Sequence, residues 1–69
     1  MSVAKVTEII ASSDTSFDDA IKKGIERASQ TLDNITSAWV ADQTVKVNGG
    51  KITSYRVNLK VTFVLKEKD

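Results

Sequence analysis

The side chains best suited to holding a ligand lie on one long predicted hairpin, residues 37–65, which carries the only Trp of the chain, Trp39. An indole stacks well on a flat π-system, and Gln43, Arg56 and Asn58 add hydrogen-bonding groups and a positive charge nearby. One face of the hairpin must cover the single helix predicted upstream. A monomer would leave the other face, with Trp39 on it, in water. This arrangement indicates assembly, with a flat ligand held between subunits.

Residue types that support catalysis are scarce. The chain has no His and no Cys, which removes the commonest general base, the commonest metal ligand and any thiolate site. Asp14, Asp18 and Asp19 offer oxygen ligands of the kind that calcium prefers. They lack the regular spacing of a calcium loop, however, and acids at a helix start usually stabilise the helix dipole. We therefore predict neither an enzyme nor a metal site.

Size and charge restrict the remaining function classes. The 69 residues predict one domain, 1–69, and a core of this size rarely supplies more than about 3–5 kcal/mol without a disulfide, a metal or a partner subunit. Self-association is the support that remains. A net charge of +1 gives no basic footprint for nucleic acid, and no apolar run approaches a membrane span. Without the features of a signal peptide in its first ten residues, the chain is expected in the cytoplasm.

The period of the apolar residues predicts the first two elements. Residues 3–11 are β-rich and predict a strand. Ser16 then has the character of a helix N-cap, with Asp19 as its capping-box partner, and we expect the helix to end near Asp33–Asn34. Gly24 in mid-helix indicates a close approach to the sheet. One apolar stripe runs along this helix, made of Phe17, Ala20, Ile21, Gly24, Ile25, Ala28 and Leu32.

The period changes to two from Ile35 onward. The odd residues from 53 to 65 form the face expected under the helix. Asn48-Gly49-Gly50 predicts a two-residue hairpin loop, which pairs odd positions of one strand with even positions of the other, unless a bulge inverts the facing. Ala38 and Val40 then join the core. The opposite face holds Ser37, Trp39, Ala41 and Gln43 beside Arg56, Asn58 and Lys60. The predicted fold class is α+β: a β-α-β-β subunit whose three-stranded antiparallel sheet wraps around one helix.

Several segments taken in order resemble the dodecin family, the small flavin-binding proteins that assemble as hollow dodecamers. They are the opening Val-Ala-Lys-Val-Thr-Glu-Ile-Ile, the helix start from Ser13 to Ile21, Arg27-Ala-Ser-Gln-Thr-Leu-Asp-Asn-Ile, the strand with the Trp, and the closing Tyr55-Arg-Val-Asn-Leu-Lys-Val-Thr-Phe63. The resemblance runs essentially from end to end. It implies a homododecamer of β-α-β-β subunits.

The resemblance also implies a flavin site. In flavin-binding dodecins, a Trp on the second strand stacks on the isoalloxazine, and a Gln after the aromatic residue of the third strand contacts the polar edge of the ring. Here the Trp position falls on Ser37 and the Gln position on Arg56, while Trp39 lies where the family usually has Glu. Trp39 is two residues further along the strand, on the same face and about 6–7 Å away.

Two readings of these residues remain open. In the first, the assembly sequesters or stores a flavin, FMN or riboflavin, through Trp39, Ser37, Arg56 and Gln43. In the second, the same cage binds no flavin and has a structural or cation-binding role, with Trp39 buried between subunits. Arg56 then pairs with Asp42 or Glu8 of a neighbouring subunit, and Gln43 is an ordinary interface hydrogen-bonding residue.

Overall fold

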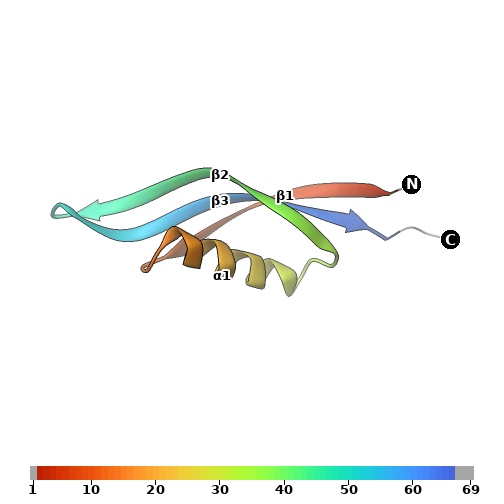
Figure 1. Cartoon of the computed structure of the whole chain (residues 1–69), viewed down its shortest axis with the longest axis horizontal. Coiled ribbons are helices and arrows are strands. Elements are labelled where there is room, and N and C mark those ends of the chain that lie inside the picture. The colour runs from red at the N-terminus through yellow and green to blue at the C-terminus, as the bar shows by residue number, and fades with distance from the viewer. Residues whose placement is uncertain (1, 67–69) are drawn as a thin grey trace.

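The computed structural model describes residues 2–66, which form one helix against a three-stranded sheet (Figure 1). The elements are β1 (Val3–Ser13), α1 (Phe17–Ser29), β2 (Ile35–Asn48) and β3 (Lys51–Leu65). Strand β3 is the central strand of the sheet and pairs antiparallel with β1 on one side and β2 on the other, giving the order β1-β3-β2. The predicted β-α-β-β fold is confirmed. The predicted domain of 1–69 extends beyond these residues, because Met1 and 67–69 lie outside the described part.

Helix α1 begins where the sequence predicts and ends earlier. The Ser16 hydroxyl accepts a hydrogen bond from the Asp19 backbone N–H at 3.0 Å, which confirms the N-cap. The expected end near Asp33–Asn34 is wrong, because the helix stops at Ser29. The backbone N–H groups of Thr31 and Leu32 both donate hydrogen bonds to the carbonyl oxygen of Ala28. Asn34 then adopts a left-handed backbone with φ of 62°, a conformation that Asn tolerates better than most residues.

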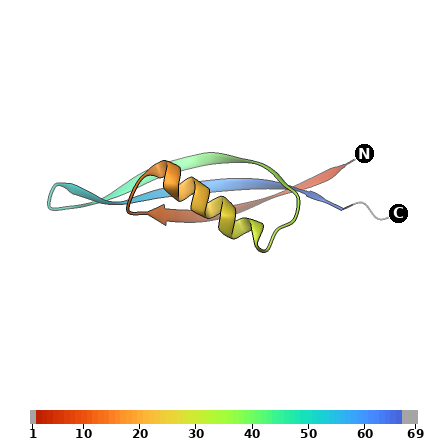
Figure 2. The same ribbon diagram turned by 60° about the horizontal axis from the view of Figure 1, so that its bottom comes forward.

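The core lies between α1 and the middle of β3 (Figure 2). Val57, Leu59 and Val61 are completely buried, as the odd-residue pattern predicts, and Ala20 packs with them from the helix. Gly24 has the predicted purpose. A Cβ atom built there would lie only 3.0 Å from the Ala11 Cβ and 3.0 Å from the Leu59 Cδ1, so any larger residue would force these neighbours or the helix to shift.

The hairpin between β2 and β3 has the predicted two-residue loop, and both of its residues, Gly49 and Gly50, have positive φ. Its register is nevertheless interrupted by bulges. An extra residue on β3 at Thr53 inverts the facing of the following pairs, and an extra residue on β2 at Ala41 restores it. Between these two bulges, Gln43 lies opposite Val57 on the helix side of the sheet. The prediction that Gln43 shares the face of Trp39 is therefore wrong, and Asp42 takes that place opposite Asn58.

The turn end of the hairpin extends well beyond the helix, which lies against only part of the sheet (Figures 1 and 2). The chain measures 57 × 19 × 13 Å, and its radius of gyration is 14.5 Å, against about 11 Å for a compact domain of this length. Ala38 and Val40 lie on the helix side as predicted, opposite Val61 and Leu59. Both are exposed in the single chain, because α1 does not cover them, so their predicted place in its core is wrong. No helix in the part that the structure describes is long and apolar enough to span a membrane.

Candidate functional site

The candidate site lies on the face of the sheet that α1 does not cover, which we call the open face. Paired residues of neighbouring antiparallel strands share a face. The open face therefore consists of the even residues of β3 and of the residues that pair with them on β1 and β2. The open face contains Val6, Glu8, Ile10 and Ser12 of β1, Arg56, Asn58, Lys60 and Thr62 of β3, and Ser37, Trp39, Asp42 and Thr44 of β2. It is a mixture of apolar, charged and hydroxyl side chains, with Trp39 the one aromatic residue among them.

Trp39 belongs to a row that crosses all three strands. On β3 its partner is Lys60, and the partner of Lys60 on β1 is Glu8. The Lys60 ammonium lies 5.2 Å from the centroid of the Trp39 ring, a cation–π contact worth about 0.5–1 kcal/mol at an exposed site. Half of the Trp39 surface, 51%, remains exposed. The indole is thus oriented by one neighbour and still open to a ligand or to another subunit.

The structure does not gather the other predicted residues around Trp39. Ser37 lies opposite Thr62, and Arg56 lies opposite Thr44 and Ser12. Along β3 the rows of Ser37 and Arg56 are six residues apart, roughly 20 Å. Trp39 lies between them, closer to Ser37. Within one subunit these residues cannot contact the same small ring, so a site that uses both must join two or more subunits.

Two further residues of the open face stand out in the structure. Lys60 was predicted on this face, but its contact with the indole becomes visible only once Trp39 is paired with it. Asn58, one row away, has a side-chain oxygen, Oδ1, that is buried and accepts no hydrogen bond from the described residues. Such an atom costs about 1–3 kcal/mol when unpaired. Asp42, the residue paired with Asn58, owes its place on this face to the bulge at Ala41, which no sequence pattern signals.

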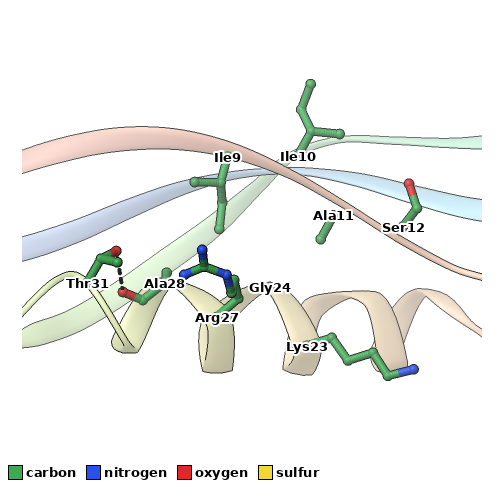
Figure 3. A pocket seen from close by; sticks show the side chains of 9 residues that line it. All are labelled: Ile9, Ile10, Ala11, Ser12, Lys23, Gly24, Arg27, Ala28 and Thr31. Atoms are coloured by element: carbon green, nitrogen blue, oxygen red, sulfur yellow. Dashed lines mark hydrogen bonds between the residues drawn. The ribbon is translucent and has the colours of Figure 1, made fainter.

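A groove lies away from this face, between β1 and α1 (Figure 3). Its volume is 490 Å³, within the range of small-molecule sites. Ile9 points into it from β1, whereas Ile10 points to the other side of the sheet, and Arg27 rises toward it from the helix (Figure 3). None of the site residues predicted from the sequence lines this groove.

The acids at the helix start are engaged in local structure. The Ser13 hydroxyl donates a hydrogen bond to the Asp19 carboxylate at 2.6 Å, and the Lys23 ammonium lies 3.1 Å from the same oxygen. Together they hold the pKa of Asp19 below its ordinary value, the Ser13 hydrogen bond contributing most. Asp14 accepts a hydrogen bond from the neighbouring Thr15 hydroxyl. Among residues 2–66 of a single chain, no three acidic side chains come together in a group that could hold a metal ion.

Comparison with known proteins gives consistent matches over nearly the whole chain. The family model described as Dodecin matches residues 3–66. The calcium dodecin of Mycobacterium tuberculosis is 42% identical over 67 residues, covering 96% of this chain and 93% of that protein.

Solved structures agree with the sequence matches. The dodecin from Streptomyces davaonensis is 39% identical with a TM-score of 0.91, covering 96% of this chain and 97% of that one. A structure of the calcium dodecin from M. tuberculosis, described as calcium chelating and as having a novel calcium-binding site, is 37% identical. Its TM-score is 0.80, and the match covers 97% of this chain and 96% of that one.

Proposed function

Because this chain belongs to the dodecin family, we propose that it is a non-enzymatic, oligomeric binding protein that sequesters or stores a flavin, FMN or riboflavin, between subunits in the cytoplasm. The observation that carries the proposal is the half-exposed Trp39, oriented by Lys60 on an uncovered sheet face. Aromatic stacking and charge hold a flat ring but transfer no chemical group, so the proposed role is storage and not catalysis.

The assembly half of the proposal is supported by exposed apolar residues. Val40, Val45 and Val47 of β2 and Ile52 of β3 are 38–61% exposed in the single chain, on the part of the hairpin that α1 does not cover. A surface of this kind is typical of an interface between subunits. The proposed working form is a homododecamer, in which neighbouring subunits cover the hairpin.

The flavin half is supported by the chemistry around Trp39. The isoalloxazine is flat and polar at one edge, and stacking on an aromatic side chain is worth about 1–3 kcal/mol for rings of similar size. Lys60 covers the indole from one direction, so a ring stacks on the other. Ser37 is two residues from Trp39 on the same strand, about 6–7 Å away, whereas the row of Arg56 is four residues from the Trp39 row along β3, so we expect Arg56 to take part from a neighbouring subunit.

Flavin fluorescence tests this proposal directly. Titrating the protein into riboflavin or FMN is expected to quench the flavin emission, because an indole in stacking contact is an efficient quencher. We expect half-saturation at several micromolar protein or below. Colour and absorbance of the freshly purified protein provide an independent reading. Emission that stays constant for both flavins up to several tens of micromolar protein would rule out the flavin role.

A second candidate function is cation binding, favoured by one specific observation. A relative that is 42% identical bears the name calcium dodecin. The single chain brings no three acidic residues together within 2–66, so a calcium site would take its oxygen ligands from more than one subunit. Glu8 and Asp42, at opposite edges of the open face, are the carboxylates placed to contribute.

Calorimetric titration with calcium tests the second candidate. If it is correct, the metal-free protein binds calcium with a defined number of sites per subunit, and Asp42→Asn removes that binding. Asp33→Asn is the matched control, because Asp33 is exposed and lies in the loop before β2. Heat changes no larger than those of dilution would exclude this role, whatever the outcome with flavin.

A further inference from the structure

We propose that Asn48, the last residue of β2, is a site of spontaneous deamidation, which converts it to aspartate or isoaspartate and adds a negative charge beside the hairpin turn. The only co-reactant is water. The site lies at the turn end of the hairpin and does not depend on any ligand of the open face.

The sequence Asn48-Gly49 places an unhindered nitrogen next to the asparagine side chain. Deamidation begins when the backbone nitrogen of the following residue attacks the side-chain carbonyl carbon, Cγ, and a side chain on that following residue obstructs the attack. Gly49 has none. A Cβ atom built on Gly49 would also have no neighbour within 4 Å, so the fold leaves open space around the reacting bond.

The reaction exchanges ammonia for water in two steps. The Gly49 nitrogen loses its proton and bonds to the Asn48 Cγ, and the bond from Cγ to the side-chain nitrogen breaks, so that ammonia leaves with the proton. Water then opens the five-membered imide. Breaking the new bond to Cγ yields aspartate, whereas breaking the original peptide bond yields isoaspartate, with one additional methylene group in the backbone.

The reacting groups are accessible in the folded chain. Asn48 and Gly49 are both exposed, and the Gly49 N–H donates no hydrogen bond to the backbone of residues 2–66. The turn lies well beyond the end of the helix (Figures 1 and 2). An element end with so little packed against it opens locally at low cost, and such opening brings the Gly49 nitrogen to Cγ.

The two other asparagines of the chain lack this combination. Asn34 precedes the β-branched Ile35, and both its carbonyl oxygen and its side-chain nitrogen are hydrogen-bonded to the Val64 backbone. Asn58 precedes the completely buried Leu59, and its own Oδ1 is buried. These two residues therefore serve as internal standards for the reaction.

Two lysines make the surroundings of Asn48 positive. Lys51 is paired directly opposite Asn48, and Lys46 lies two residues earlier on the same strand. Negative charge develops on the side-chain oxygen as Cγ is attacked, and positive groups nearby stabilise it. The product carboxylate also gains an opposite charge across the strand pair. Its formation takes the formal net charge of the subunit from +1 to zero, a change that lowers solubility.

Peptide mapping by mass spectrometry tests the proposal after the intact protein is incubated at neutral and mildly alkaline pH. Deamidation raises the mass of a peptide by about 1 Da, and the aspartate and isoaspartate forms separate chromatographically. We expect the increase in the peptide that contains Asn48 and not, over the same time, in those with Asn34 or Asn58. The rate should rise with pH, because the attacking nitrogen must lose its proton.

Gly49→Ala and Gly50→Ala form a matched pair of variants. Both place a Cβ atom on a turn residue with positive φ, 58° and 78°, so both strain the turn, but only Gly49→Ala obstructs the attacking nitrogen. We expect Gly49→Ala to deamidate about tenfold more slowly than the native protein, and Gly50→Ala at least as fast as the native protein. Asn48→Asp should elute from an ion-exchange column with the aspartate product.

Three results would overturn the inference. They are no mass increase at Asn48 in the folded protein, equal rates at Asn48, Asn34 and Asn58, and equal rates in Gly49→Ala and Gly50→Ala. The same chain unfolded in urea is the positive control for the chemistry. None of these results bears on flavin or calcium binding, so the proposed function stands or fails separately.

Discussion

Replacing Val45 by lysine is expected to disassemble this protein. Val45 is 40% exposed in the single chain and lies on the helix side of the hairpin, opposite Tyr55. In a working monomer the substitution would cost no more than about 0.5 kcal/mol, as for most surface positions. If a neighbouring subunit covers this surface, each copy of the variant buries an unpaired ammonium in the interface. Burying a charge without a partner typically costs several kcal/mol. Repetition over every subunit contact makes this the largest effect that we expect.

Sedimentation velocity at micromolar concentration measures the effect of this substitution. The native protein should sediment as one species of twelve 7.5-kDa subunits, and Val45→Lys as monomers or small oligomers with reduced β-sheet circular dichroism. Gln30→Lys adds the same charge at the exposed end of α1 and should leave the assembly unchanged. A native monomer, or a Val45→Lys variant that sediments like the native protein, would contradict the proposed covering of the hairpin.

Truncation of Trp39 separates the two roles that remain open for this residue. As a stacking side chain, Trp39 supplies about 1–3 kcal/mol of binding energy, so Trp39→Ala should weaken flavin affinity by roughly 5- to 150-fold and leave the oligomer intact. If Trp39 is instead the centre of a subunit contact, Trp39→Ala removes a large buried side chain from every such contact. Losses of that kind are about 3–5 kcal/mol per site and would lower the melting temperature of the assembly steeply.

Both properties should be measured on the same samples, flavin affinity by fluorescence and assembly by sedimentation and thermal melting. Thr44→Ala is the matched control, since Thr44 is on the open face of the same strand, opposite Arg56. The stacking role predicts that Trp39→Ala and native protein sediment alike and differ in affinity. Dissociation of Trp39→Ala without flavin would assign the indole to the interface.

The fold was largely predictable because its signals are local. The alternation of Val57, Leu59 and Val61 places the core face of β3, and the two Gly residues of the loop specify the turn. The N-cap at Ser16 is likewise encoded within one turn of helix. Each of these features depends on residues that are close in sequence, which is why a pattern of apolar and turn residues is enough to find them.

The errors arise where contacts distant in sequence decide the outcome. After α1, the chain is tied to β3 at Asn34: the Val64 N–H donates to the Asn34 carbonyl oxygen at 3.0 Å, thirty residues away, and the Asn34 side chain donates back to the Val64 carbonyl oxygen. Gln43 changes face because of a bulge that only the paired strands define. Trp39 was placed on the correct face, because two bulges of opposite effect cancel before the register reaches it. The contact of Trp39 with Lys60 could not be predicted without knowing that these two residues are paired across β2 and β3.

The interrupted register of the hairpin also bears on aggregation. A free edge strand as long as β2, fourteen residues, with water on both faces would ordinarily be a template for cross-β growth. Steric zippers need segments of about six or seven residues in continuous pairing. In this hairpin the irregularities limit every uninterrupted run of pairs to five residues or fewer. On β2 itself the extra residue at Ala41 bends the edge between Val40 and Asp42, so the apolar residues toward its two ends cannot pair with a second chain in one continuous run.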